Sequence, residues 1–183
     1  MTTTLYIVLV VAWLTWVMPF FLAKRPGGEA LLKLDRRARW GIVLQAVAYS
    51  LLWQNRFWDR PLDGWRLPVS ICFFVGASAL SWTAARALGR QWRFDAGLNK
   101  NHELVTSGPY RLVRHPIYLS MLCLLLGTGF MITPWATLTI SLVAYVIGTE
   151  IRIRIEDRLL AENFGEEFHQ YRHSASAYIP FIR

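Results

Sequence analysis

A stretch of 33 residues without a charged side chain, from Pro116 to Gly148, limits the folds that are open to this chain. As a single helix it would be roughly 50 Å long, well beyond the ~30 Å hydrocarbon core of a bilayer. Pro134 lies inside the stretch and cannot continue a regular helix without a kink. We therefore expect two short apolar helices, over 117–132 and 135–150, that form a hairpin.

Three more apolar stretches precede the hairpin, at 5–22, 41–53 and 67–88. The first is free of charge over 18 residues, which is near the minimum for a membrane span. No Lys or Arg precedes it, as a secretory signal would require, so we expect a retained helix that Pro19 kinks or ends. The pattern predicts an all-α integral membrane protein with about five transmembrane helices.

Basic residues are distributed unevenly around these predicted spans. If the five spans alternate in direction, 17 of the 20 Lys and Arg residues fall on one side, in 24–39, in 86–114 and in the tail after 150. Cytoplasmic segments of membrane proteins carry such an excess, so we expect these segments in the cytoplasm and the N-terminus outside. The net charge of +8 suits anionic lipid headgroups, and no reading element for nucleic acid is recognisable.

Polar residues gather in two of the basic segments, 89–118 and 150–172. Both adjoin membrane helices, so we expect them to close over each other at the membrane surface, with a cytoplasmic cofactor pocket built from 102–118 and 150–172. The second segment is predicted to be an amphipathic helix, interrupted at Gly165. No dinucleotide-binding or P-loop motif is present, which argues against a soluble nucleotide-binding domain. Neither Cys72 nor Cys123 has metal-ligand spacing, so no metal site is predicted.

One stretch carries a more specific signal. It reads HELVTSGPYRLVRHPIY over 102–118, and Pro116 suits the first position of the following helix. Arg114 and His115 directly precede that helix N-terminus, whose partial positive charge favours an anion such as a carboxylate. After the predicted hairpin the chain reads RIRIEDRLLAENFGEEFHQYR over 152–172.

The order and spacing of these two stretches resemble the isoprenylcysteine carboxyl methyltransferase family of integral membrane enzymes, over about residues 90–183. Five spans are similar to its compact prokaryotic members, which implies a prokaryotic cell (inner) membrane. The resemblance implies a membrane region over 1–88 with three spans and a catalytic region over 89–183. It implies S-adenosylmethionine as the methyl donor and a lipophilic or lipidated acceptor, with the carboxylate of a prenylcysteine-like substrate favoured.

The resemblance also assigns residues to this chemistry. It implies that Arg152 faces the acceptor. A carboxylate acceptor is already an anion and needs a cation to place it rather than a base, and Arg152 or Arg114 could supply that cation. The cofactor-binding positions that it implies are His102, Glu103, Leu104, Val105, Tyr110, His115, Pro116, Ile117, Tyr118 and Glu156.

Three other interpretations stay open. Related membrane methyltransferases act on phospholipid amines or small thiols, and such an acceptor would lose a proton to His115 or Glu156. Membrane sterol reductases share an R-H-P-x-Y-like segment but bind NADPH and are usually longer. A small membrane scaffold or lipid-binding protein is the alternative without catalysis.

Overall fold

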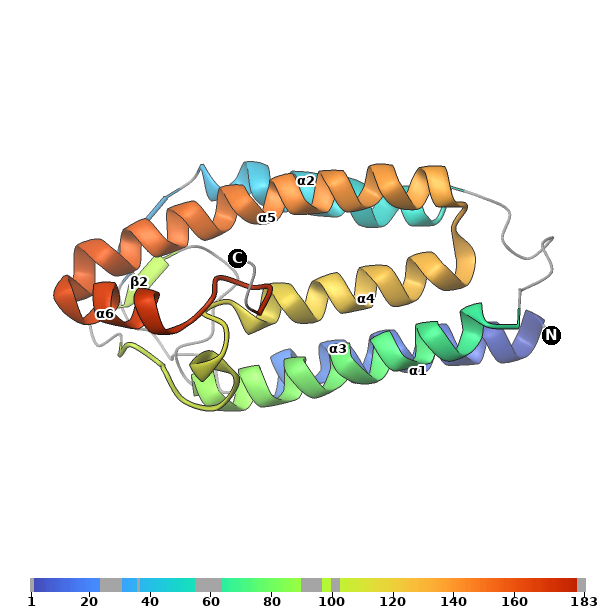
Figure 1. The fold of residues 1–183 in the computed structure, drawn as a ribbon, viewed down its shortest axis with the longest axis horizontal. Coiled ribbons are helices and arrows are strands. Elements are labelled where there is room, and N and C mark those ends of the chain that lie inside the picture. The colour runs from blue at the N-terminus through green and yellow to red at the C-terminus, as the bar shows by residue number, and fades with distance from the viewer. Residues whose placement is uncertain are drawn as a thin grey trace.

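Among the residues that the structure describes, five apolar helices run back and forth along one long axis (Figure 1). The structure is a computed structural model, and it describes residues 2–23, 31–35, 37–54, 64–89, 97–99 and 103–180. The helices are α1 (Thr2–Leu22), α2 (Ala38–Leu52), α3 (Arg66–Leu88), α4 (Pro116–Ile132) and α5 (Trp135–Phe164). By length and composition α1, α3 and α5 can cross a membrane, and α2 and α4 are shorter apolar helices. The predicted helical membrane fold is confirmed.

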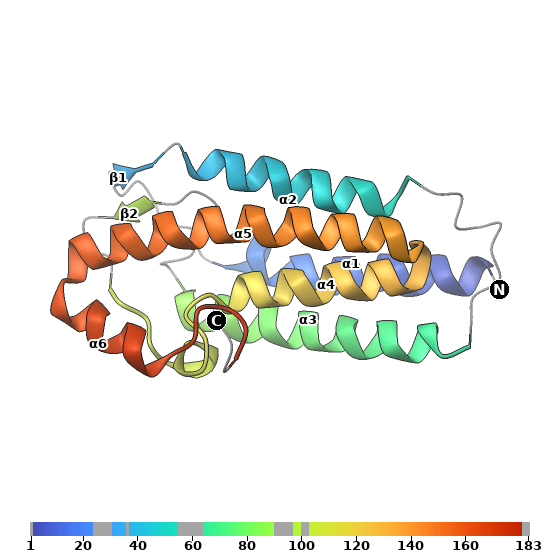
Figure 2. The same ribbon diagram turned by 45° about the horizontal axis from the view of Figure 1, so that its top comes forward.

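The small elements all lie at one end of the helices, where α1, α3 and α5 end (Figure 2). They are β1 (Leu31–Leu34), β2 (Gly97–Asn99), the 3-10 helix η3 (Gly108–Arg111) and α6 (Glu166–Ser174). The two strands pair antiparallel, with Leu34 opposite Gly97. This ribbon is an addition to the predicted all-helical pattern, and it joins the two connections that precede α2 and α4.

α1 ends at Leu22, the end of the predicted apolar stretch, and continues past Pro19, where a kink or an end was expected. One boundary differs from the sequence predictions. The second hairpin helix and the charged tail helix are one continuous helix, α5, of 30 residues. It ends where the interruption was predicted, at Gly165, whose φ of 53° favours glycine. Since nothing between Gly148 and Phe164 breaks a helix, α5 carries charged residues beyond the apolar part without a change of direction.

Two glycines allow α2 and α5 to cross closely. A Cβ atom on Gly148 would lie 2.8 Å from the carbonyl oxygen of Gly41 and 2.9 Å from Cβ of Leu44. Small residues promote such backbone contacts between membrane helices, where burial from water contributes little. The side-chain amide of Gln45 also donates to Thr149 Oγ1 at 2.9 Å. This crossing holds Arg152, one turn further along α5, against the beginning of α2.

We predict that Gly148→Ala destabilises the protein. The added methyl group meets backbone and Cβ atoms of α2 rather than a flexible side-chain end, so the helices must separate, at a cost of about 1–3 kcal/mol. Thermal unfolding in detergent, followed by circular dichroism, would measure the loss. Gly76→Ala in α3 is the matched control, because a Cβ there meets nothing within 4 Å. An equal loss of stability in both variants would contradict the crossing.

Candidate functional site

The chain entering α4 is fixed by the segment that follows α6. The backbone N–H of Arg114 donates to the carbonyl of Ser176 at 2.8 Å, and that of His115 donates to Ala177 at 2.8 Å. The Tyr171 hydroxyl donates to the carbonyl of Tyr110 at 2.7 Å. Arg114 and His115 are therefore held at the start of α4, at the end of the bundle where the polar segments meet.

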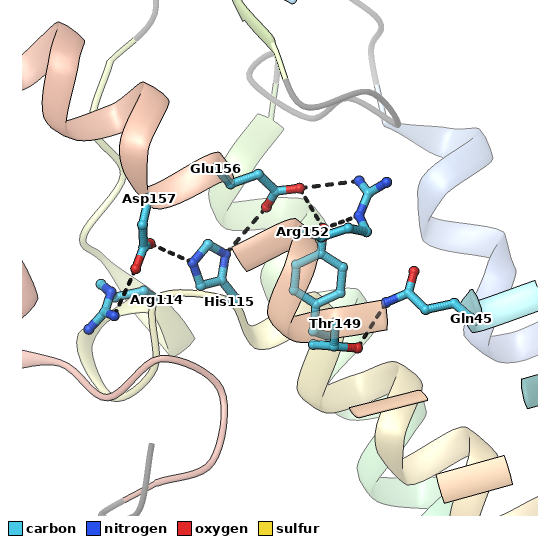
Figure 3. A network of polar contacts seen from close by, with 8 residues as sticks. Gln45, Arg114, His115, Thr149, Arg152, Glu156 and Asp157 are labelled. Atoms are coloured by element: carbon cyan, nitrogen blue, oxygen red, sulfur yellow. Dashed lines mark hydrogen bonds and ion pairs between the residues drawn. The ribbon is translucent and has the colours of Figure 1, made fainter. Parts of the chain in front are cut away.

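A chain of alternating charges connects this loop to α5 (Figure 3). Arg114 Nη2 lies 3.0 Å from Asp157 Oδ2, and Asp157 Oδ1 lies 2.8 Å from His115 Nε2. On the other side of the ring, His115 Nδ1 lies 3.5 Å from Glu156 Oε2. Glu156 Oε1 in turn accepts from Arg152 Nη2 at 3.2 Å. Two arginines and His115 thus alternate with two carboxylates in a largely buried row.

Tyr118 closes the network on the side of α4. Its hydroxyl donates to Glu156 Oε1 at 2.5 Å and accepts from Arg152 Nε at 2.5 Å. The carbonyl oxygen of Tyr118 accepts from the Tyr145 hydroxyl at 2.6 Å. Glu156 therefore receives contacts from α4, from α5 and from the loop before α4 at once.

The neighbours of His115 favour its cationic form. Burial by itself lowers the pKa of His115, but hydrogen bonds and charges of Asp157 and Glu156 outweigh it and raise this pKa above its usual value. Both ring nitrogens face carboxylate oxygens, which suits the imidazolium, because only that form carries a donor on each nitrogen. His115 is thus poorly placed to accept a proton.

A first cavity, here called the loop cavity, opens between the loop before α4, the end of α5 and α6. It combines charged groups with apolar and aromatic walls. Its lining residues are Leu88, Glu103, Leu104, Val105, Tyr110, Arg114, His115, Ile117, Tyr118, Glu156, Leu160 and Tyr171. Nine of the site residues proposed from the sequence meet here. Pro116 is buried at the start of α4 and Arg152 lies outside the lining, while His102 falls outside the described residues.

A second, larger cavity, here called the membrane cavity, lies between α1, α2, α4 and α5. Its volume of about 410 Å³ falls in the range of roughly 300–1,000 Å³ that is usual for small-molecule sites. Its walls are mostly apolar, with polar groups toward the charged network. The lining residues are Trp13, Trp16, Val17, Phe20, Ile42, Gln45, Ala46, Tyr49, Ile117, Tyr118, Met121, Arg152 and Glu156. The two cavities share Ile117, Tyr118 and Glu156, which form the wall between them.

Arg114 and Asp157 have surroundings that the sequence did not indicate. Arg114 lines the loop cavity only, and its guanidinium also donates to the carbonyl of Ala175 at 2.5 Å and that of Arg172 at 3.3 Å. These hydrogen bonds connect Arg114 to the C-terminal end of α6. Asp157 was not singled out, although its place directly after Glu156 puts both carboxylates near the same loop.

The membrane cavity draws much of its wall from α1, whose sequence gave no sign of a site beyond apolarity. The indole N–H of Trp13 donates to Thr128 Oγ1 at 3.2 Å and that of Trp16 to Ser120 Oγ at 3.1 Å, so both rings are anchored to α4.

Within the described part of the chain, no group of three or more His, Cys, Asp or Glu side chains is placed to hold a metal ion.

The fold and the site define a helical membrane protein with two adjoining cavities. One is lined by charged as well as apolar groups and the other is mostly apolar, and they meet at Ile117, Tyr118 and Glu156. Residues 65–167 match the phospholipid methyltransferase family model. Because this match covers more than half of the chain, the protein belongs to that family of membrane methyltransferases.

Individual relatives include both metal-resistance proteins and methyltransferases. The chain is 34% identical over 154 residues to the cobalt-zinc-cadmium resistance protein CzcN of Cupriavidus metallidurans. The matched residues make up 83% of this chain and 67% of that protein. The chain is 39% identical over 85 residues to the protein-S-isoprenylcysteine O-methyltransferase of Schizosaccharomyces pombe, over 46% of this chain and 36% of that enzyme. A probable enzyme of the same name from Oryza sativa subsp. indica is 37% identical over 82 residues, over 44% and 42% of the two chains. The resemblance found in the sequence is confirmed.

The raised pKa of His115 predicts how stability changes with pH. Its stabilising contribution is fully present below the ordinary pKa of about 6.5 and is lost as pH rises through the raised pKa of the folded protein. Thermal unfolding in detergent, measured from about pH 6 to about pH 9, should therefore show a loss of stability as the pH rises. His115→Gln should abolish this loss. Asp157→Asn should shift the loss to lower pH. An identical slope in wild type and His115→Gln would contradict the paired imidazolium.

Proposed function

We propose that the protein transfers a methyl group from S-adenosylmethionine, bound in the loop cavity, to a lipophilic acceptor bound in the membrane cavity. The observation that supports this most is the wall that the two cavities share, formed by Ile117, Tyr118 and Glu156. In-line displacement needs donor and acceptor on either side of one point with water kept out. Two cavities of different polarity that meet at one wall suit that requirement.

The groups lining the loop cavity fit this cofactor chemically. Glu103 and Glu156 offer carboxylates to its positive groups, and Arg114 brings a positive charge to the lining, which suits its carboxylate. Apolar and aromatic side chains such as Leu160 cover the remainder of the wall, as a nucleoside base requires. When bound, the cofactor supplies a methyl group on a sulfonium sulfur, which needs no base to become reactive.

Arg152 and Tyr118 orient the acceptor in this proposal. Arg152 lines the membrane cavity but not the loop cavity, so its positive charge faces the acceptor side. Tyr118 holds the guanidinium through Nε and braces Glu156 at the same time. An acceptor anion near Arg152 would thus be aligned and desolvated at the shared wall, while its apolar part extends toward Trp13 and Tyr49.

The state of the network favours an acceptor that arrives as an anion. His115 is held as the imidazolium, and Asp157 is engaged by Arg114 and His115. Glu156 already accepts from Tyr118 and Arg152. A protonated amine or a neutral thiol would need one of these groups to take up a proton. A carboxylate needs none, so we favour the carboxylate of a prenylcysteine-like compound over a phospholipid amine or a thiol.

We further propose that the site lies at the cytoplasmic face of a prokaryotic inner membrane. The connections rich in Lys and Arg adjoin the end of the bundle that carries η3 and α6 (Figure 2). The positive-inside rule makes that end cytoplasmic and leaves the N-terminus outside. The division into a membrane region over 1–88 and a catalytic region over 89–183 stays a prediction. Residues from the first region also line the membrane cavity, namely Trp13, Trp16, Val17, Phe20, Ile42, Gln45, Ala46 and Tyr49.

Calorimetric titration of the purified protein with S-adenosylhomocysteine tests the cofactor. We expect binding that Glu156→Gln weakens by roughly tenfold or more, because the variant loses a charge that contacts His115 and Arg152. Glu162→Gln is the matched control, an exposed carboxylate on the same helix. Binding of NADPH in place of S-adenosylhomocysteine would move the protein to the reductases, and equal affinities for the two variants would remove Glu156 from the site.

Filling the membrane cavity tests where the acceptor binds. Ala46→Trp adds a large side chain to the cavity wall, so we expect KM for a farnesylated cysteine analogue to rise by roughly tenfold with S-adenosylhomocysteine affinity unchanged. Val47→Trp is the matched control, because Val47 is exposed on the same helix and lines neither cavity. Unchanged acceptor kinetics in Ala46→Trp would contradict the assignment even if methyl transfer itself is observed.

A further inference from the structure

The outward face of α5 carries an apolar stripe that ends in arginines. Ile140, Val143 and Ile147 are 60%, 54% and 50% exposed. Arg154 and Arg158 continue the same stripe, because steps of three, four and seven residues keep one face of a helix. In this membrane protein the apolar part of the stripe faces lipid, and the arginines follow it toward the end that carries α6.

These arginines border a cavity of about 300 Å³ that is distinct from the two already described. Arg172 of α6 completes it, so three arginine residues from two helices line one hollow, here called the arginine cavity. Its lining residues are Ile153, Arg154, Asp157, Arg158, Ala161 and Arg172. None of them belongs to the membrane cavity, and the methyl-transfer proposal gives the arginine cavity no role.

The acidic groups nearby leave these arginines available to an anion. Arg154 lies 3.6 Å from Glu150, and Arg158 lies 3.1 Å from Glu162. Both arginine side chains are about three-quarters exposed, and exposed pairs of this kind are weak. The remaining carboxylate, Asp157, is engaged by Arg114 and His115 on its other side. A phosphate, which guanidinium groups bind through paired hydrogen bonds, can therefore compete for the arginines.

We propose that the arginine cavity binds the phosphate of an anionic phospholipid whose acyl chain lies along Ile147, Val143 and Ile140. The spacing fits a lipid. From Arg154 to Ile140 the helix rises by roughly 21 Å, enough to cover one leaflet, which is about half of the ~30 Å hydrocarbon core. A soluble phosphate would use the arginines but not the stripe, so the continuity of the two favours the lipid.

Native mass spectrometry of the detergent-solubilised full chain tests this proposal with phosphatidylglycerol and phosphatidylcholine as probes. We expect phosphatidylglycerol to bind preferentially and the double variant Arg154→Gln/Arg158→Gln to weaken it by roughly tenfold, since each arginine near a lipid surface contributes several-fold. Arg39→Gln/Arg86→Gln is the matched control. It removes two exposed arginines near the same end of the bundle that line none of the three cavities.

Three results would overturn the proposal. Equal binding of the two lipids would deny a role for headgroup charge, and equal weakening in both double variants would reduce the effect to net charge. Displacement of phosphatidylglycerol by inorganic phosphate at equal concentration would make a soluble anion the occupant. Because all four substituted arginines are exposed, we expect both double variants to keep the wild-type circular dichroism spectrum, which separates lost binding from lost folding.

Discussion

Compensation of the Glu156 carboxylate is the condition on which the rest of the site depends. A charge near the membrane core is costly unless it is paired, and removing one partner leaves another charge uncompensated. Here the cost is met by alternating signs from Arg114 through Asp157, His115 and Glu156 to Arg152. Each member contacts the next one, so the row connects the loop before α4 to α5. It includes Glu156, which lines both cavities.

The helix packing decides where that row lies. The close crossing at Gly41 and Gly148 brings α5 against α2, and the charged part of α5 begins directly afterwards. α4 contributes Tyr118 from its first turn. The loop cavity therefore forms on one side of Glu156 and the membrane cavity on the other. Both are built from helices and from the loop before α4 rather than from a separate soluble domain.

The sequence predicted those features that depend on local chemistry. Charge-free runs and Pro134 placed the helices, and the two polar motifs supplied most of the residues that line the loop cavity. Features that depend on contacts distant in sequence were not predictable in the same way. Asp157 gains its role only from the position of His115, and Trp13 reaches the membrane cavity only through the packing of α1. The continuity of α5 was not predicted, because the apolar stretch up to 150 and the charged stretch after it were interpreted as two helices.

The pairing of residues 112–115 with the segment after α6 has a consequence for biosynthesis. In chain order this segment follows all five apolar helices, yet its carbonyls of Ser176 and Ala177 hold the backbone of Arg114 and His115. Because a chain is synthesised from its N-terminus at about 5–20 residues per second, several seconds pass between the synthesis of α4 and that of these partners. The membrane helices can thus insert before the backbone hydrogen bonds that hold Arg114 and His115 are formed.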